Sequence, residues 1–506
     1  MICLTIVLIA LIAALFYVYF TWNFDYWKKR GVEGPKPKPF IGSYPGMFSK
    51  TTHMVDDYER IYRSYKDKER FVGVFNLRDP QLLITDPKLG RDILVANFKN
   101  FHDNTLSKLV NREQDPLFSE HPFIISGADW KTTRQMISPA LAGNRLKAYY
   151  PIILQTCEKL KKHLSKVCKS PPKEGVDAKE LSKMFTLDII AAGIYDVDSE
   201  NFTDKHPTEM FKITEGLFNQ NLFFLFYSTL ISMFPKLMSV FHVSFFDYKV
   251  GKYFTKVLDQ SAKRKEKSGV LGQDFLSFLM ELEKRNPMTR SKMTAHTMSF
   301  LIDGFDTTAC LITNVLLYIA RNPEVQEKII QESEDNIDEN GSPTLETIND
   351  LKYLDAVFHE AYRVLPPVLF YSKICTEKIE IERKDGSKFL IEEGVECVIP
   401  NLSYQKDEHY FENPDVFDDE RLIEDGVLKK LKNEGLLMPF GDGPRACMGM
   451  RLATLELKAF LIETVRNFKV SVNKKTRIDN KIDPNLFIGC LDGGVWLDFE
   501  PRKKDL

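Results

Sequence analysis

Phe440-Gly441-Asp442-Gly443-Pro444-Arg445-Ala446-Cys447-Met448-Gly449 places one cysteine between a glycine-rich loop and a helical pattern that runs from Met450 to Phe468. Glycines in the loop let a large flat group approach the backbone without meeting a Cβ atom. The N-terminus of the helix offers free N–H groups and the positive end of the helix dipole, and both stabilise sulfur as a thiolate. The pattern indicates a metal-bound thiolate, with Arg445 placed to pair with an acidic group.

These ten residues resemble the haem-binding signature of the cytochrome P-450 family, Phe-x-x-Gly-x-Arg-x-Cys-x-Gly. The five matched positions are Phe440, Gly443, Arg445, Cys447 and Gly449. The resemblance implies that Cys447 is the axial thiolate ligand of the iron of haem b, and that Arg445 pairs with a haem propionate. The alternative for a single cysteine is a buried structural thiol, but five matches in a strand–loop–helix context favour the haem ligand.

A second motif, Gly304-Phe305-Asp306-Thr307-Thr308, lies inside a predicted helix over Thr294–Arg321. A glycine inside a helix costs about 1 kcal/mol relative to alanine, so a functional reason is expected. The segment resembles the oxygen-activation motif of the family, Ala/Gly-Gly-x-Asp/Glu-Thr. The resemblance implies that Thr307 is the hydroxyl donor at the oxygen-binding site, and that Asp306 connects it to solvent protons as a general acid.

Asp303 departs from this motif, because the family usually has alanine or glycine there. Asp303 and Thr307 are four residues apart and share a helix face. The carboxylate is therefore expected either to face the distal pocket, where it affects proton delivery or attracts basic substrates, or to turn to solvent or an arginine.

Three further sets of residues carry the resemblance. Glu360-Ala361-Tyr362-Arg363 resembles the Glu-x-x-Arg motif, with Arg421 as third member, which implies a buried charge cluster that stabilises the haem-binding core. Trp130 and Arg134 resemble the family's Trp-x-x-x-Arg, which implies contacts with a haem propionate. Lys373 stands where many relatives carry a propionate-binding arginine, so it keeps the charge but loses the planar fork.

The N-terminal segment Ile2–Trp22 contains no charged residue and is long enough to span a bilayer. Basic residues follow it at 28–30 and none precedes it, which predicts a retained anchor with the main body in the cytosol. The next segment alternates proline with lysine from Gly34 to Pro39, which favours an extended spacer. We expect a transmembrane signal anchor at 1–24, a basic, proline-rich hinge at 25–45, and one haem-thiolate catalytic domain at 46–506.

The fold class is predicted to be mainly α with small β-sheets, the cytochrome P-450 fold. Helical periodicity predicts helices at 54–65, 88–98, 145–167, 178–194, 248–265, 294–321, 324–334 and 453–468. Strand-like runs occur at 71–75, 81–84, 379–382, 389–391 and 395–399. No linker divides the body, which indicates a single large unit.

Composition excludes some functions. The chain has 506 residues, 43% of them hydrophobic, and a net charge of −2, so nucleic acid is not expected as a partner. Its eight cysteines are scattered and form no CxxC, which is typical of reduced thiols in a cytosolic compartment.

The resemblance is closest to the animal microsomal clan that handles xenobiotics, including insect detoxification enzymes. It implies a monooxygenase of the endoplasmic reticulum membrane that inserts one oxygen atom of O₂ into lipophilic substrates such as xenobiotics, hormones or fatty acids. No flavin or nicotinamide fingerprint is present, so electrons are expected from NADPH through NADPH–cytochrome reductase, with cytochrome b5 as a second possible donor. The family's substrate lining falls on 102–127, 217–246, 368–370 and 486–492.

Two alternatives stay open. One is a haem-thiolate isomerase or dehydratase that works without reductase, although such relatives often lose the acid–alcohol pair seen here as Asp306-Thr307. The other is a haem-binding carrier or sensor without turnover. Detoxification and endogenous hormone or lipid metabolism are not distinguished by the sequence.

Overall fold

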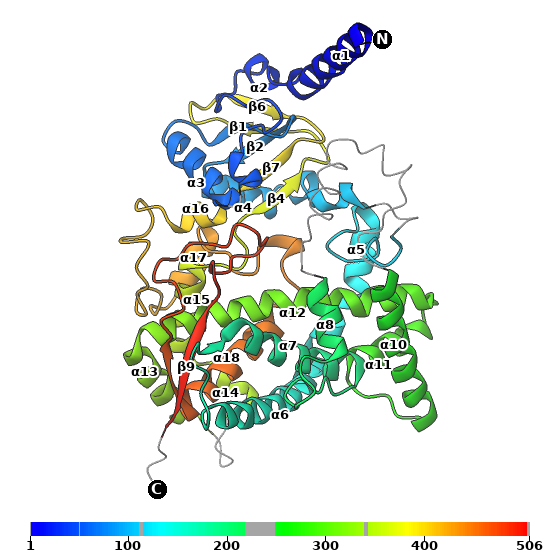
Figure 1. Cartoon of the computed structure of the whole chain (residues 1–506), viewed down its shortest axis with the longest axis vertical. Coiled ribbons are helices and arrows are strands. Elements are labelled where there is room, and N and C mark those ends of the chain that lie inside the picture. Colours follow the sequence, from blue (N-terminus) through cyan, green and yellow to red (C-terminus); the bar gives the residue numbers. More distant parts are fainter. Residues whose placement is uncertain (1, 50, 111–114, 218–247, 338–342, 503–506) are drawn as a thin grey trace.

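The protein is described by a computed structural model that covers residues 2–49, 51–110, 115–217, 248–337 and 343–502. Figure 1 shows a sheet-rich region near the N-terminus and a larger helical region crossed by the long helix α12 (Arg290–Arg321). The chain is therefore mainly α-helical with small sheets, as its sequence predicts.

All eight predicted helices are present in the described residues. Besides α12, the α-helices are α1 (Ile2–Thr21), α2 (Tyr26–Lys29), α3 (Met54–Tyr65), α4 (Pro87–Leu94), α5 (Gly127–Ile137), α6 (Gly143–Val167), α7 (Ala178–Tyr195), α8 (Glu209–Gly216), α10 (Tyr248–Ser268), α11 (Phe275–Glu283), α13 (Pro323–Glu334), α14 (Leu345–Asn349), α15 (Lys352–Val364), α16 (Asn401–Gln405), α17 (Val427–Asn433) and α18 (Met450–Asn467). The predicted continuation of α4 to Phe98 is wrong. The N–H of Asn97 donates to the carbonyl of Asp92, five residues back, and this bond turns the chain out of the helix.

Helix α12 forms the centre of the helical region. It begins at Arg290 rather than at the predicted Thr294, because the Thr289 hydroxyl accepts a hydrogen bond from the N–H of Lys292 and caps the helix. Its most extensive packing is against α7, and it also packs against α10, α15 and α18. A helix buried on most sides can present functional groups only where its surface remains open.

The sheets are small. One has the strand order β1 (Phe71–Asn76), β2 (Asp79–Ile84), β7 (Glu396–Ile399), β4 (Tyr371–Ile374). The second has the order β3 (Val176–Asp177), β9 (Trp496–Pro501), β8 (Phe468–Val472), and the third pairs β5 (Ile379–Glu382) with β6 (Lys388–Ile391). Pairing of Lys373 with Cys397 in the β4–β7 register places Lys373 at the junction between the first sheet and the helical region.

The N-terminal helix α1 projects away from the body (Figure 1). It has 20 residues, a mean hydropathy of 2.7, and only Phe20 buried. At about 1.5 Å per residue, its length matches a bilayer core of about 30 Å. The segment after it packs on the first sheet, because the Trp27 indole donates to Val74 O at 2.9 Å and Tyr44 is fully buried.

Glu456 is a buried acid on α18, and its pKa provides a test of how strongly this helix is buried. It is 2% exposed, and burial raises the pKa of its carboxyl to about 8. The unfolded chain ionises this group near pH 4.5, so its contribution to folding stability is lost as the pH rises from about 4.5 to about 8. We expect Glu456→Gln to raise the free energy of unfolding by roughly 1–4 kcal/mol at pH 8 and hardly at all at pH 4.5.

Thermal unfolding of the haem-loaded protein across this pH range measures the effect. The exposed Glu424 offers a matched control, since Glu424→Gln should shift the curve equally at all pH values. A Glu456→Gln shift that does not change with pH would contradict the assignment.

Candidate active site

Cys447 lies between the 3-10 turn Gly443–Arg445 and α18. Its N–H donates to Phe440 O at 2.9 Å, which closes the loop. Gly443 has a φ of +73°, and a Cβ there would lie 2.1 Å from Leu94 O, so only glycine fits. The Cys447 side chain has accessible surface, yet it is surrounded by enough protein to be desolvated. The thiol therefore faces an internal space rather than the outer surface.

Opposing effects act on the Cys447 thiol. Burial, the largest of them, and the negative charge of Asp303 raise its pKa, which is about 11 after all effects are included. Hydrogen bonds from the backbone of Gly449 and Met450, together with the charge of Arg134, hold it down. The helix start thus directs donors at the sulfur, as the sequence predicts, but they do not by themselves make it a thiolate at neutral pH.

The Arg445 side chain makes hydrogen bonds to three backbone carbonyls and an ion pair to one carboxylate. Its guanidinium donates to the carbonyls of His102 at 2.8 Å, Pro122 at 3.2 Å and Ile125 at 3.0 Å. It also pairs with Asp103 at 3.3 Å. Burial lowers its pKa to about 10.

Trp130 and Arg134, on α5, join this group. The Arg445 guanidinium lies 4.2 Å from the centre of the Trp130 ring, and Arg134 donates to the carbonyl of Ala446. Lys373 approaches from β4, where its ammonium donates to Asn104 Oδ1 at 2.6 Å. Burial lowers the Lys373 pKa to about 7, and the charge of Arg445 lowers it further.

These three basic side chains, Arg134, Lys373 and Arg445, are called the cationic cluster below. Among the described residues, Asp103 is the one carboxylate within ion-pair distance of the cluster. Three cations and one acid leave a surplus of positive charge in a desolvated place, which an anionic ligand would neutralise.

The opposite wall comes from α12. Asp303, Gly304 and Thr307 lie on one face and have accessible surface, whereas Phe305 and Asp306 are buried. The Thr307 hydroxyl donates to the carbonyl of Asp303. His121 lies 3.3 Å from Asp303, and the carbonyl of the next residue, Pro122, accepts from Arg445 of the cysteine loop at 3.2 Å. The segment 121–122 therefore joins this face of α12 to the cysteine loop, and the space between them is called the pocket below.

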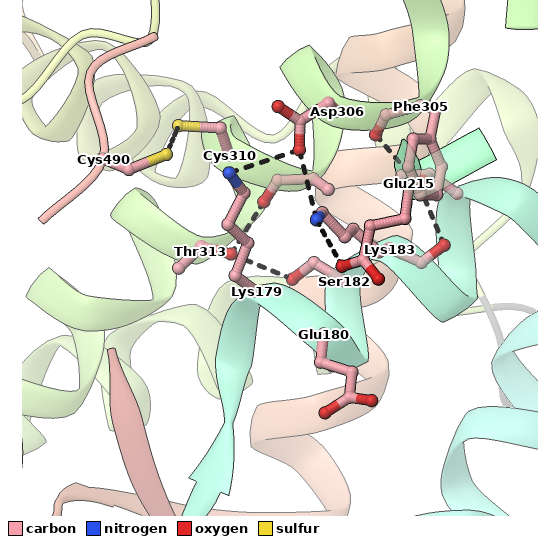
Figure 2. A network of polar contacts seen from close by, with 12 residues as sticks. Lys179, Glu180, Ser182, Lys183, Glu215, Phe305, Asp306, Cys310, Thr313 and Cys490 are labelled. Carbon is pink, nitrogen blue, oxygen red and sulfur yellow. Dashed lines mark hydrogen bonds and ion pairs between the residues drawn. The ribbon is translucent and has the colours of Figure 1, made fainter. Parts of the chain in front are cut away.

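Asp306 points away from this face into a network with α7 (Figure 2). Its carboxylate lies 3.2 Å from the ammonium of Lys179 and 3.7 Å from that of Lys183. Lys183 continues to Glu215 on α8 at 3.0 Å, and the Glu215 side chain is 39% exposed. The buried acid is thus connected by ion pairs to a partly exposed one.

A pair of sulfur atoms adjoins this network. Cys310 on α12 and Cys490, 180 residues later, lie with their Sγ atoms 3.1 Å apart (Figure 2). Lys179 interacts with the Cys490 thiol and lowers its pKa, after the larger effect of the bond from Cys310. The two thiols connect α12 to the segment around 486–492.

Glu360, Arg363 and Arg421 lie in contact. Arg363 donates to both carboxylate oxygens of Glu360 at 2.8 Å, and both side chains are fully buried. Arg421 donates to the same carboxylate at 3.0 Å. The remaining Arg363 donors reach the carbonyls of 405, 414 and 416, so every charge in this cluster has partners.

The family model for cytochrome P450 matches residues 32–491. The chain belongs to the cytochrome P450 family. It is 38% identical to the probable cytochrome P450 28a5 of Drosophila melanogaster, over 99% of this chain and 100% of that protein. It is 38% identical to the probable cytochrome P450 28d1 of the same fly, over 98% of both chains. It is 28% identical to cytochrome P450 9e2 of Blattella germanica, over 98% of this chain and 97% of that one.

As a cytochrome P450, the protein is a haem-thiolate monooxygenase with insect relatives, as its sequence predicts. The residues present fit a haem on two counts. Cys447 offers a sulfur that receives two backbone N–H groups. The cationic cluster offers surplus positive charge for the two propionates of the porphyrin.

Sequence reasoning did not single out Lys179, Lys183 and Glu215, and it included Asp103, His121 and Cys490 only as parts of the predicted lining segments 102–127 and 486–492, without their contacts. All act through contacts over long sequence separations, and no local motif marks them. The predicted substrate-entry segment 217–246 lies, apart from Leu217, outside the described residues, as do residues 111–114 of the predicted lining.

The buried charge cluster gives a prediction. In Glu360→Gln the carboxylate is lost and the Arg363 guanidinium stays buried without its counter-charge, at a cost of roughly 3–5 kcal/mol. We expect little or no folded, haem-bearing protein from this variant, as measured by haem absorbance per polypeptide and by the unfolding temperature.

The exposed pair Lys352–Asp425, 3.1 Å apart, is the matched control. Asp425→Asn should lose less than about 0.5 kcal/mol, because exposed ion pairs contribute little. Equal yields and unfolding temperatures for the two variants would show that the buried cluster contributes no more to stability than the exposed ion pair does.

Proposed function

We propose that Cys447 is the axial ligand, and that this P450 is a microsomal monooxygenase of lipophilic substrates that takes its electrons from NADPH through a partner reductase. One observation supports this most: the segment 121–122 joins the open face of α12 to the cysteine loop, beside a cationic cluster suited to propionates. When bound, thiolate-ligated haem activates O₂ with two electrons and inserts one oxygen atom into the substrate.

The cysteine loop would hold the porphyrin through its backbone and its cations. Phe440 and the glycines Gly443 and Gly449 shape the loop so that a flat group can lie against it. Arg134, Lys373, Arg445 and the Trp130 ring lie on the side that suits the carboxylates of the group.

Thr307 and Asp306 have different parts in proton handling. Thr307 faces the pocket and holds its hydroxyl hydrogen toward Asp303 O, from which it can turn to donate into the pocket. Asp306, one residue earlier, exchanges protons with the outside through Lys179, Lys183 and Glu215. This arrangement favours a monooxygenase over the isomerase or dehydratase, which needs no delivered protons.

The exposed, apolar α1 supports a membrane anchor at 1–24, followed by the hinge at 25–45 and the catalytic domain at 46–506. Lys28, Lys29 and Arg30 directly after α1 favour a cytosolic body at the endoplasmic reticulum membrane. Lys131 and Lys430 are exposed, and Lys432 lies 3.4 Å from Asp442 of the cysteine loop. These lysines would meet acidic groups of NADPH–cytochrome reductase or of cytochrome b5.

The proposed substrate class rests on the predicted lining segments. Phe370 and Phe487 lie in two predicted lining segments, and their rings are 5.8 Å apart. Aromatic side chains in these segments suit lipophilic molecules, whether xenobiotics or endogenous hormones and lipids. The test is NADPH consumption and product formation by the full chain with reductase: product without reductase would favour the isomerase, and no product with any substrate would favour the carrier.

The ligand assignment is tested by Cys447→Ser. We expect wild-type protein, reduced under CO, to show the strongly red-shifted Soret band of thiolate-ligated haem, and the variant to lack it because serine offers no soft sulfur ligand. Cys157→Ser, at a buried cysteine far from the loop in sequence, is the control and should keep the band. A band in Cys447→Ser identical to wild type would exclude this ligand.

The proton route is tested by Asp306→Asn. We expect product formation to fall by about 10²-fold and its solvent isotope effect to rise, because proton delivery becomes slower. Glu180, one residue from Lys179, points away from the network in Figure 2 and pairs with His206 instead. Glu180→Gln should therefore leave turnover unchanged, and an unchanged rate in Asp306→Asn would contradict the route.

A further inference from the structure

Asp303 is an exposed carboxylate in the middle of a buried helix. Its side chain is 56% exposed, whereas Leu301, Phe305 and Asp306 around it on α12 are buried. Its charge reaches the Cys447 thiol across the pocket and raises the pKa of that thiol. Its exposure and its contact with His121, whose neighbour Pro122 accepts from Arg445 at 3.2 Å, put Asp303 on the pocket side of α12.

His121 approaches Asp303 from the loop before α5. Its ring is about nineteen-twentieths buried, and its Nε2 lies 3.3 Å from Asp303 Oδ1 with no hydrogen-bond partner. The other ring nitrogen, Nδ1, accepts the N–H of Phe123 at 3.1 Å. A nitrogen that accepts carries no proton, so the ring proton of His121 is on Nε2, which lies within ion-pair distance of Asp303 but is not aligned as a hydrogen bond.

A neutral histidine orients the carboxylate without neutralising it. No lysine or arginine in the described part of the chain pairs with Asp303, whereas Asp306, three residues later, has Lys179 and Lys183. The surroundings are apolar: the Phe118 ring lies 5.7 Å from that of His121, and Phe118, Ile124 and Leu301 belong to one hydrophobic cluster. Asp303 is thus a carboxylate without a basic partner that stands at the edge of an apolar cluster, where it can attract a cation.

We propose that Asp303, oriented by His121, is a cation-binding subsite of the pocket that selects lipophilic substrates carrying a protonated or quaternary amine. The inference rests on the proposed function in taking the pocket beside Cys447 as the substrate site. The ammonium group of the substrate lies against the second carboxylate oxygen of Asp303. The lipophilic part of the substrate extends along the hydrophobic cluster that contains Phe118, Ile124 and Leu301.

The test compares two probes on the full, haem-loaded chain by equilibrium dialysis. One is phenylbutyltrimethylammonium, whose nitrogen has no lone pair and cannot bind iron. The other is the hydrocarbon in which a carbon atom replaces that nitrogen. We expect Asp303→Asn to weaken binding of the ammonium by about tenfold and to change binding of the hydrocarbon by less than about twofold.

Two matched variants make the result specific. Asp303→Glu and Asp303→Gln have the same size and differ in charge, so only Asp303→Glu should retain the wild-type affinity ratio of the two probes, even where Asp303→Asn loses haem. Asp306→Asn should keep that ratio, because its carboxylate is already paired with lysines.

The same ratio in wild type and in both uncharged Asp303 variants would overturn the proposal, as would an equal loss in Asp306→Asn. Binding is read without reductase or NADPH. A protein that prefers the ammonium probe but forms no product would overturn the proposed monooxygenase and leave the subsite standing. A protein that forms product but shows no preference for the ammonium probe would overturn the subsite and leave the monooxygenase standing.

Discussion

Helix α12 crosses the hydrophobic core, so a polar side chain that it carries is stable where it finds a partner or faces an opening, and the buried His296, with neither ring nitrogen bonded, departs from this. Asn314 donates to Leu365 O at 2.9 Å and to Gly489 O at 2.8 Å, and Thr313 donates to Ala309 O at 2.7 Å. Asp306 is held by two lysines. Asp303 and Thr307 face the pocket instead, and Gly304 between them lets the helix approach Ile190 of α7, which would lie 3.0 Å from a Cβ there. The same constraint that stabilises the helix therefore concentrates its reactive groups at one place.

The two sides of the pocket carry opposite charge. The cysteine side has the surplus positive charge of the cationic cluster, and the α12 side has the single carboxylate of Asp303. Haem propionates suit the first side and a cationic substrate suits the second. Both ligands would compensate an unpaired charge, so each wall is more stable with its ligand than without it.

The sequence predicted what local patterns encode. The cysteine loop, the Glu360–Arg363 pair and the central helix follow from residues fewer than ten positions apart or from periodicity along one helix. What it missed depends on distant contacts: His121 meets Asp303, Lys179 meets Asp306, and Cys310 meets Cys490. The orientation of Asp303 stayed open for the same reason, because a helix face is known from spacing but the element packed against that face is not. Strand β3, with two residues, is too short to show an alternating pattern.

Lys373 shows what a change from arginine alters. A guanidinium keeps its charge at any physiological pH, whereas the buried ammonium of Lys373 has a pKa of about 7. Its one polar contact with Asn104 stabilises either protonation state, since a neutral amine also donates. Near neutral pH the cationic cluster therefore holds its full charge only when an anion lies beside it, because the anion favours the protonated amine. An arginine would carry that charge permanently, at a greater desolvation cost to the folded chain before the anion arrives.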